Sequence, residues 1–384
     1  MRLLFVIPGI SGGGTERSLR ELVPSLVETG ADVSIAYMVR RGTDDTAELE
    51  RAGARLHHIA AHRLDGRARA VRRVIARERP DIVHTSLYEA DIAGRLAAWR
   101  APRASPVVLS SIVNTSYDPA RLGDPSVKAW KLRGVQLLDG WTARHLTNHF
   151  HAVSCAVKDA AVRALGIDPN RVTVVERGRD MRRLGDPSAG RRRRARTELG
   201  IGEKASVIVT VGRQDFQKGQ SYLVEGFDAL AGTHPDAELL LVGPRGTQSR
   251  QIDGRINQSP HRDRIKVLGH RDDVPDILAA ADVFVLPSLY EGFPGAVIEA
   301  MALGLPVIAS ELPTLHEVVE GGRSGLLVPP RDPAQLAKSM SRMLDDPKLS
   351  EHCGARGREL FLMRLTAEQS HRRMLDLYQR LLAA

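Results

Sequence analysis

The strongest constraint on the fold is a repeated series of short apolar runs that alternate with segments of helical periodicity. Six such runs occur in the first half of the chain and six in the second. They lie at residues 2–9, 32–39, 81–86, 106–114, 151–154, 171–178, 206–213, 237–244, 264–270, 282–288, 305–310 and 325–330. Strand, helix and strand in repetition predict an α/β protein with parallel sheets covered on both faces. The 384 residues are enough for two such doubly wound domains.

The alternation breaks at residues 180–205. This stretch contains a Gly-Asp-Pro turn and a run of arginines, and we interpret it as a linker whose arginine run begins the next helix. The break predicts domains at residues 1–185 and 186–361, with a helical tail to the end of the chain. Doubly wound domains bind ligands at the carboxyl ends of their strands, so a cleft between the two domains is the expected site.

Length and composition exclude several classes of protein. No window approaches about twenty apolar residues, which excludes a membrane-spanning helix. The apolar start of the chain is too short for a signal peptide and runs into a glycine-rich turn, so we interpret it as a first strand. Cys155 and Cys353 form no disulfide framework, which favours the cytoplasm.

The chain is basic, with a formal net charge of +9 and a pI near 9.9. Only 8 of the 55 basic residues are lysines, so a general preference for arginine is one explanation of the charge. Attraction to an anionic membrane, to nucleic acid or to a phosphorylated ligand is an equally good explanation. No aromatic residue interleaves with the densest arginine run, at residues 190–200. Surfaces for single-stranded nucleic acid use aromatic stacking platforms, so nucleic acid is not an expected partner.

Two clusters at predicted strand ends suit phosphates. The first, PGISGGGTERS at residues 8–18, opens a helix, and its glycines let backbone N–H groups approach a phosphate. Its spacing does not match the G-x-G-x-x-G of dinucleotide sites, and a plain tight turn explains it equally well. The second, VGRQDFQKGQ, places Arg213 and Lys218 where they can grip a diphosphate, but for this cluster taken singly a solvated turn with two surface charges is the favoured interpretation.

A third cluster, LYEGFPGAVIEAMALG at residues 289–304, carries two glutamates around a turn. Pro294 suits the first turn of a helix, so Gly295 and Ala296 offer N–H groups to an anion. Phosphates would repel a bare carboxylate, so each glutamate makes sense only where it faces hydroxyls. Glu291 then suits a transferred group and Glu299 a ribose diol. An ordinary helix charge is the alternative for Glu299, disfavoured because the three clusters fit one ligand.

These residues resemble a known family. The cations Arg213 and Lys218, the E-x7-E glutamate pair, and the stretches AMALGLPVIAS and EVVEGGRSGLLVPPRDP are similar to the retaining GT-B glycosyltransferases of family GT4. The SGGGTERS loop and DIVHTSLYEADIAGRLAA resemble the family's N-terminal half. The resemblance covers essentially the whole chain. It implies two Rossmann-like domains that face a central cleft, with the last helix, about residues 362–384, crossing back onto domain 1–185.

The resemblance also implies roles for the donor-site residues. Arg213 and Lys218 would neutralise a diphosphate leaving group, which Gly13 and Gly14 would contact from the other domain. His270 would lie near the base. No metal and no cofactor are implied, since a nucleoside-diphosphate sugar is the co-substrate. UDP is favoured over GDP on family frequency, and the acceptor is a hydroxyl of a cell-envelope glycan, a glycolipid or a secondary metabolite.

Two departures from the family pattern affect the same site. Members often have a histidine that faces the donor sugar, whereas SSIVNTS puts Val113 there, or Asn114 with a shift of one residue. The Gly-Phe-Gly often found after the first glutamate is Gly-Phe-Pro-Gly, so Pro294 removes one N–H donor.

Two further features have competing interpretations. His84 ends a predicted strand, and we include it among the catalytic candidates with a structural role equally open. The helical segment at residues 126–150 has an aromatic and basic face. Covering the sheet is the favoured interpretation, and contact with a membrane or a lipid-linked acceptor is the alternative.

The sequence therefore predicts a cytoplasmic, metal-independent, retaining glycosyltransferase, with peripheral contact to the inner face of the membrane as an open possibility. A GT-B nucleotide-sugar epimerase or hydrolase is one alternative. A non-catalytic, basic, anion-binding protein is the other, and its binding would not depend on Glu291 or Glu299.

Overall fold

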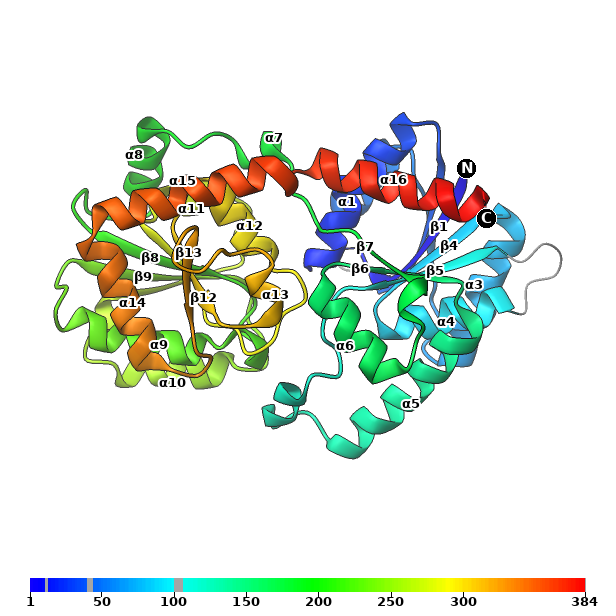
Figure 1. Cartoon of the computed structure of the whole chain (residues 1–384), viewed down its shortest axis with the longest axis horizontal. Helices are drawn as coiled ribbons and strands as arrows, with labels where there is room; N and C mark the ends of the chain where they lie inside the picture. The colour runs from blue at the N-terminus through cyan, green and yellow to red at the C-terminus, as the bar shows by residue number, and fades with distance from the viewer. Residues whose placement is uncertain (11–12, 40–43, 100–105, 384) are drawn as a thin grey trace. The chain divides into compact units, whose positions relative to one another are not determined.

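Two parallel β-sheets organise the chain (Figure 1). The computed structural model describes residues 1–10, 13–39, 44–99 and 106–383. The chain splits into unit 1, Met1–Gly178 with Ala367–Ala384, and unit 2, Arg179–Thr366. The prediction of an α/β chain with two parallel, doubly wound sheets is confirmed.

The sheet of unit 1 has the strand order β3-β2-β1-β4-β5-β6-β7. Its strands are β1 (Arg2–Gly9), β2 (Asp32–Val39), β3 (Arg55–His58), β4 (Ile82–Ser86), β5 (Val107–Ile112), β6 (His149–Ala152) and β7 (Val172–Val174). The chain runs outward in one direction from β1 to β3 and then returns to the other side of β1 at β4. The point between β1 and β4 is where ligands bind in sheets of this kind.

Both faces of this sheet are covered because both sets of alternating side chains in its strands are apolar. Phe5 and Ile7 of β1 join the cluster formed with α1 and α16, whereas Leu4 and Val6 point to the opposite face and pack with α3 and α4. The helices of unit 1 are α1 (Gly14–Glu28), α2 (Asp44–Arg51), α3 (Leu64–Glu78), α4 (Tyr88–Trp99), α5 (Ala129–Leu146), α6 (Cys155–Leu165) and α16 (Ala367–Ala383), with short 3-10 turns η1 (Pro119–Gly123) and η2 (Pro169–Arg171).

The sheet of unit 2 has the order β10-β9-β8-β11-β12-β13 and the same reversal, between β8 and β11. Its strands are β8 (Ser206–Val211), β9 (Ala237–Val242), β10 (Ile265–Gly269), β11 (Val283–Leu286), β12 (Val307–Ser310) and β13 (Gly325–Val328). The helices are α7 (Met181–Leu184), α8 (Ala189–Glu198), α9 (Gln220–Ala231), α10 (Ser249–Gln258), α11 (Val274–Ala280), α12 (Gly295–Ala302), α13 (Pro313–His316), α14 (Pro333–Asp345) and α15 (Pro347–Arg364), with η3 (Phe216–Lys218) and η4 (Arg262–Arg264). Helices α9, α10, α14 and α15 contribute to one apolar cluster with the strands.

The stretch interpreted as a linker is packed into unit 2. Ser188 is the N-cap residue of helix α8, and its side chain accepts a hydrogen bond from Arg191 N. Arg192 and Arg196 then form ion pairs with Asp282 at 2.5 and 2.8 Å, and Arg191 pairs with Asp276. The prediction that the arginine run begins a helix is confirmed, and carboxylates 85 and 90 positions further along the chain hold Arg191 and Arg192 within unit 2.

The helix at residues 126–150 does not use its aromatic face to cover the sheet. Helix α5 packs on α4 and α6 through small and polar residues, whereas Trp130 and Leu137 are 70% and 74% exposed. The favoured interpretation of this face is therefore wrong. No helix in the described ranges is long and apolar enough to cross a membrane.

Candidate active site

Each sheet places chemically useful side chains at its reversal point. In unit 2, Lys218 lies in the loop after β8 and Glu291 in the loop after β11, and these two strands are neighbours. The two loops also touch, because Leu289 N donates to Gln217 O at 2.8 Å. Residues that are 73 positions apart in the sequence thus meet at one sheet edge.

Glu291 is buried and held by three donors. Lys218 Nζ lies 2.5 Å from Glu291 Oε1, Ser288 Oγ donates to the same oxygen at 2.7 Å, and Gln217 Nε2 donates to Oε2 at 3.2 Å. Glu291 is only 5% exposed. A buried carboxylate costs free energy unless it is paired, and these donors supply the pairing and fix its orientation.

Glu299 forms a second buried ion pair. Its Oε1 accepts from Arg179 Nε at 2.8 Å, and both side chains are almost fully buried. The Arg179 guanidinium lies against Gly295, where a Cβ atom would overlap it. Gly295 therefore supplies the close approach of side chain to backbone that lets Arg179 reach Glu299.

Helix α12 begins beside this pair. Its first intrahelical bonds are donated by Val297 and Ile298 to Pro294 O, so the amides of Gly295 and Ala296 precede the hydrogen-bonded part of the helix. Amides in this position point toward a ligand at the helix N-terminus. This is the place in the helix that the sequence predicted for them.

Two other predicted residues lie along the same sheet edge and are more exposed. Arg213 follows β8, is 59% exposed in its side chain and forms an ion pair with Asp215. His270 follows β10, is 68% exposed in its side chain and has Nε2 3.6 Å from Asp272 Oδ1. Strand β10 is separated from β8 by β9, so neighbouring-strand spacing puts His270 about 10 Å along the edge from the end of β8.

In unit 1 the predicted glycines open α1. Gly13 is the N-cap residue and Gly14 the first residue of the helix, whereas Ser11 and Gly12 of the same loop lie outside the described residues. Arg177 Nη2 donates to Thr15 Oγ1 at 2.8 Å, and a Cβ on Gly14 would lie 3.6 Å from Arg177 Nη1. A full positive charge thus stands beside a helix N-terminus, and both favour an anion.

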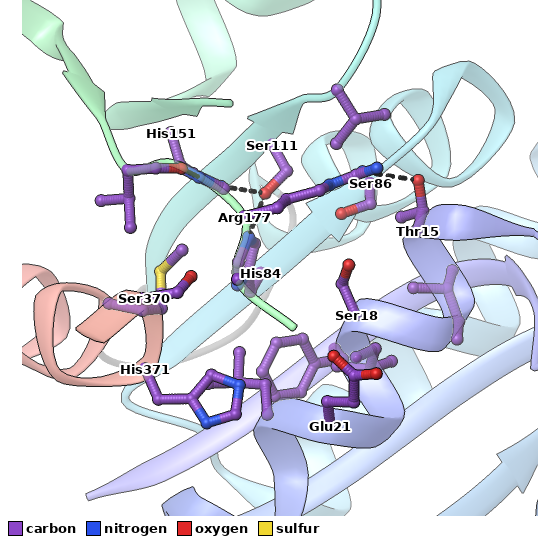
Figure 2. A pocket seen from close by; sticks show the side chains of 18 residues that line it. Thr15, Ser18, Glu21, His84, Ser86, Ser111, His151, Arg177, Ser370 and His371 are labelled. Atoms are coloured by element: carbon purple, nitrogen blue, oxygen red, sulfur yellow. Dashed lines mark hydrogen bonds between the residues drawn. The ribbon is translucent and has the colours of Figure 1, made fainter. Parts of the chain in front are cut away.

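Figure 2 shows the pocket that contains this arginine. It lies within unit 1, between α1, the carboxyl ends of β1, β4, β5 and β6, and α16. Its polar lining side chains are Thr15, Ser18, Glu21, His84, Ser86, Ser111, His151, Arg177, Ser370 and His371. Val113, one of the two residues that can align with the family's usual histidine, lines it as well. The pocket is therefore lined by both apolar side chains and hydrogen-bonding groups.

His84 belongs to a hydrogen-bond chain whose direction is fixed. His151 Nε2 lies 2.9 Å from Val175 O, which only accepts, so Nε2 carries the proton and His151 Nδ1 accepts from Ser111 Oγ at 2.7 Å. Ser111 Oγ then accepts from His84 Nε2 at 2.6 Å, and His84 Nδ1 accepts from Tyr378 Oη at 2.7 Å. This series of hydrogen bonds links α16 to β4, β5 and β6, and it gives both nitrogens of the His84 and His151 rings a partner.

Burial keeps both imidazoles neutral. It lowers the pKa of His84 to about 3, with a smaller contribution from His151, and it lowers the pKa of His151 to about 4. Burial also raises the pKa of Tyr378 well above its usual value, so the phenol stays a donor. The contacts favour the structural role for His84, and its catalytic role stays a prediction.

The chain belongs to the family of group 1 glycosyltransferases, and its fold is the GT-B fold of two Rossmann-like domains. The family "Glycosyl transferases group 1" matches residues 191–360, and "Glycosyl transferase 4-like domain" matches residues 13–178. The alpha-maltose-1-phosphate synthase of Mycolicibacterium smegmatis is 30% identical, with 80% of each chain covered. The resemblance to a GT4-type glycosyltransferase is confirmed.

Other relatives and solved structures are consistent with this family. The UDP-Gal:alpha-D-GlcNAc-diphosphoundecaprenol alpha-1,3-galactosyltransferase of Escherichia coli is 28% identical over 72% of this chain and 70% of its own. HepE of Anabaena in complex with UDP-glucose has a TM-score of 0.85 at 20% identity and covers 99% of this chain and 100% of its own. Sucrose-phosphate synthase from Thermosynechococcus elongatus has a TM-score of 0.83 at 23% identity and covers 100% of this chain and 99% of its own. These structures show the fold.

The structure adds residues that the sequence interpretation missed. In unit 2 these are Arg179, Gln217 and Ser288, and in unit 1 they are Arg177 and Thr15. Ser288 could have been found from its place three residues before Glu291 at the end of an apolar run. Arg179 and Arg177 carried no such signal, because both lie in a stretch where arginine is common. Among the described residues, no group of three or more His, Cys, Asp or Glu side chains is arranged to hold a metal ion.

Proposed function

We propose that this glycosyltransferase moves a sugar from a nucleoside-diphosphate sugar to a hydroxyl acceptor, with retention of anomeric configuration and without a metal. One observation carries the proposal. The cation Lys218 and the buried carboxylates Glu291 and Glu299 lie in unit 2 at loop and helix positions that follow two neighbouring strands. Cations suit a leaving diphosphate, and buried carboxylates suit sugar and ribose hydroxyls.

UDP is the favoured nucleotide. The names of the E. coli relative and of the HepE complex both include a UDP-sugar. In this chain, Glu299 would accept hydrogen bonds from ribose hydroxyls and Glu291 from the transferred sugar. His270 would lie near the base. Gly13 and Gly14 stand at the start of α1, where backbone amides suit an anion such as a phosphate.

The chemistry asked of these residues is electrostatic. The acceptor oxygen forms a bond to the anomeric carbon while the bond from that carbon to the diphosphate oxygen breaks on the same face of the sugar. The acceptor proton passes to an oxygen of the leaving diphosphate, so no protein base is required. Arg213 and Lys218 stabilise the negative charge that develops on the diphosphate, which is the work a metal ion does in other enzymes.

The acceptor is proposed to bind unit 1, in the pocket between α1 and α16. Its mixed lining suits a molecule with both hydroxyls and apolar surface, such as a glycan, a glycolipid or a secondary metabolite. Arg177 and Ser18 provide hydrogen-bonding groups at one wall and His371 at another (Figure 2). A cytoplasmic location goes with this proposal, because nucleotide sugars are the co-substrates.

The test is product analysis with UDP-glucose and UDP-galactose, with and without a panel of hydroxyl acceptors and EDTA. Transfer with the α-configured donor giving an α-linked product, at a rate that EDTA leaves unchanged, is the expected result. Sugar release or epimerisation with donor alone, at a rate that no acceptor raises, would favour an epimerase or hydrolase. A β-linked product would overturn retention.

A further inference from the structure

Helix α5 carries an apolar stripe that no described residue of unit 1 covers. Four of the eleven large hydrophobic side chains that are exposed in the described part of the chain belong to this single helix. Trp130, Leu137 and Trp141 are 70%, 74% and 45% exposed. Leu137 and Trp141 follow Trp130 by seven and eleven positions, so the three side chains lie within about 40° of one another around the helix axis.

The inward face of α5 explains why these residues point outward. Asp139 Oδ1 accepts from the buried Arg95 at 2.6 Å, and Asp139 Oδ2 accepts from Tyr117 Oη at 2.7 Å. Gly140 and Thr142 are also buried on this side. The inward contacts are thus made by polar and small side chains, and they fix the rotation of the helix so that Trp130 and Trp141 stay exposed.

Cations flank the stripe. Arg133 lies on one side of it and Lys131 on the other, and Lys128 precedes the helix, whereas Arg144 donates to Leu165 O at 2.6 Å. Lys131 Nζ stands 5.5 Å from the centre of the Trp130 ring. The one carboxylate of the helix, Asp139, is turned inward. The outward face therefore combines apolar side chains with positive charge and has no acidic residue.

We propose that this face of α5 is a docking surface for a bilayer of anionic lipid. An exposed helix with tryptophans and leucines in one stripe and basic residues on both flanks suits the plane of the lipid interface. Tryptophan rings favour the headgroup level, and the flanking cations attract anionic headgroups. The basic flanks disfavour a second copy of this chain, because two such faces would repel each other. The inference does not depend on the proposed reaction, since binding needs no turnover.

The test uses the full chain with Trp99→Phe, so that only Trp130 and Trp141 emit. Vesicles of phosphatidylcholine, with or without about 30% phosphatidylglycerol, are added at low salt. The expected result is co-sedimentation at least about tenfold stronger with the anionic vesicles, with a blue-shifted emission that brominated lipids quench. Added salt should weaken the binding, because it screens the flanking cations.

Two pairs of variants locate the surface. One variant combines Trp130→Ser with Trp141→Ser, and the other combines Lys131→Gln with Arg133→Gln. Co-sedimentation should show that each variant binds anionic vesicles about tenfold or more weakly than the parent. The matched controls remove exposed apolar or basic side chains from unit 2: Leu362→Ser with Met363→Ser, and Arg193→Gln with Arg194→Gln. The controls should bind as the parent does. Thermal unfolding confirms that each variant is folded.

Three outcomes would overturn the proposal. The first is equal sedimentation with both kinds of vesicle and no loss in the α5 variants. The second is absence of vesicle binding by the folded parent protein. The third is a concentration-dependent dimer, seen by analytical ultracentrifugation, that the tryptophan substitutions dissociate while vesicles are not bound. That result would make the face a contact between copies of the chain.

Discussion

Lys218 Nζ lies 2.5 Å from Glu291 Oε1, so the cation proposed for the donor diphosphate and the carboxylate proposed for the donor sugar hold each other in place. Glu291 also accepts from Ser288 and Gln217. Each partner is therefore oriented before any ligand arrives. Such preorganisation is what makes a charged group effective on a developing charge, because no free energy is spent on reorienting it.

Replacing Lys218 by methionine tests this pair. The substitution keeps much of the side-chain volume but removes the charge, so it should lower kcat/KM for transfer by about 10²–10³-fold. It should also weaken binding of the nucleoside diphosphate, measured by calorimetry. Lys338→Met, at an exposed position on α14, is the matched control and should retain parental activity. Parental kcat/KM in Lys218→Met would contradict the assignment.

Gly295→Ala tests the close approach of Arg179 to α12. The added Cβ would overlap the Arg179 guanidinium, which must then move and give up its contact with Glu299. Since both charges are buried, we expect the free energy of unfolding to fall by about 3 kcal/mol and nucleotide affinity to fall with it. Urea unfolding and calorimetry measure the two effects.

The control for this substitution is Gly254→Ala. Gly254 lies inside α10, where an added Cβ meets no atom within 4 Å. Alanine stabilises a helix interior relative to glycine by about 1 kcal/mol. The two substitutions should therefore change stability in opposite directions. A Gly295→Ala protein as stable as the parent would show that Arg179 can be accommodated elsewhere.

Stability should fall as the solution becomes acidic. The pKa values of His84 and His151, about 3 and about 4, lie below the value of about 6.5 that each has when unfolded. The unfolded state therefore binds more protons below pH 6.5. The stability that these two groups contribute is complete above about pH 6.5 and is lost as the pH falls toward about 4. Partial burial lowers the pKa values of His57 and His149, which adds to the loss.

Asp91 has the opposite effect on the pH dependence of stability, and its substitution tests this account. Burial raises its pKa to about 7, so near pH 5.5 Asp91 takes up a proton on folding while the two histidines release theirs. These three groups alone give one net proton and a slope of about 1.4 kcal/mol per pH unit, and Asp91→Asn should steepen the measured slope by about a further 1.4. Urea unfolding at closely spaced values around pH 5.5 measures the slope. Asp159→Asn, at an exposed position on α6, should leave it unchanged, and a shallower slope in Asp91→Asn would contradict the account.

Much of the fold could be predicted because each strand is marked by its own sequence. Runs such as DVSIAYMV coincide with a strand, Asp32–Val39, since apolar residues on both faces of a parallel sheet leave a continuous signal. Strand β3, Arg55–His58, was missed because its four residues are polar or half-buried. Edge strands have only one neighbour and need less apolar surface.

The site was partly predictable for the same reason. Lys218 and Glu291 could be placed at strand ends, but their direct ion pair depends on how two loops pack, which no local pattern encodes. Arg179 is further removed, because it reaches Glu299 from 120 positions away. The rotation of α5 was misjudged because the aromatic residues looked like a core face, whereas the Asp139–Arg95 pair turns the polar side inward.

The most direct test of the account is calorimetric binding of UDP, GDP and ADP, with and without EDTA, to the parent protein and to Glu299→Gln. Glutamine keeps an acceptor for Arg179 while removing the charge that a ribose diol would meet. We predict selective binding of UDP that EDTA does not change and that weakens about tenfold or more in the variant. Equal, salt-sensitive binding of all three nucleotides to both proteins would contradict the account and indicate a general anion-binding surface.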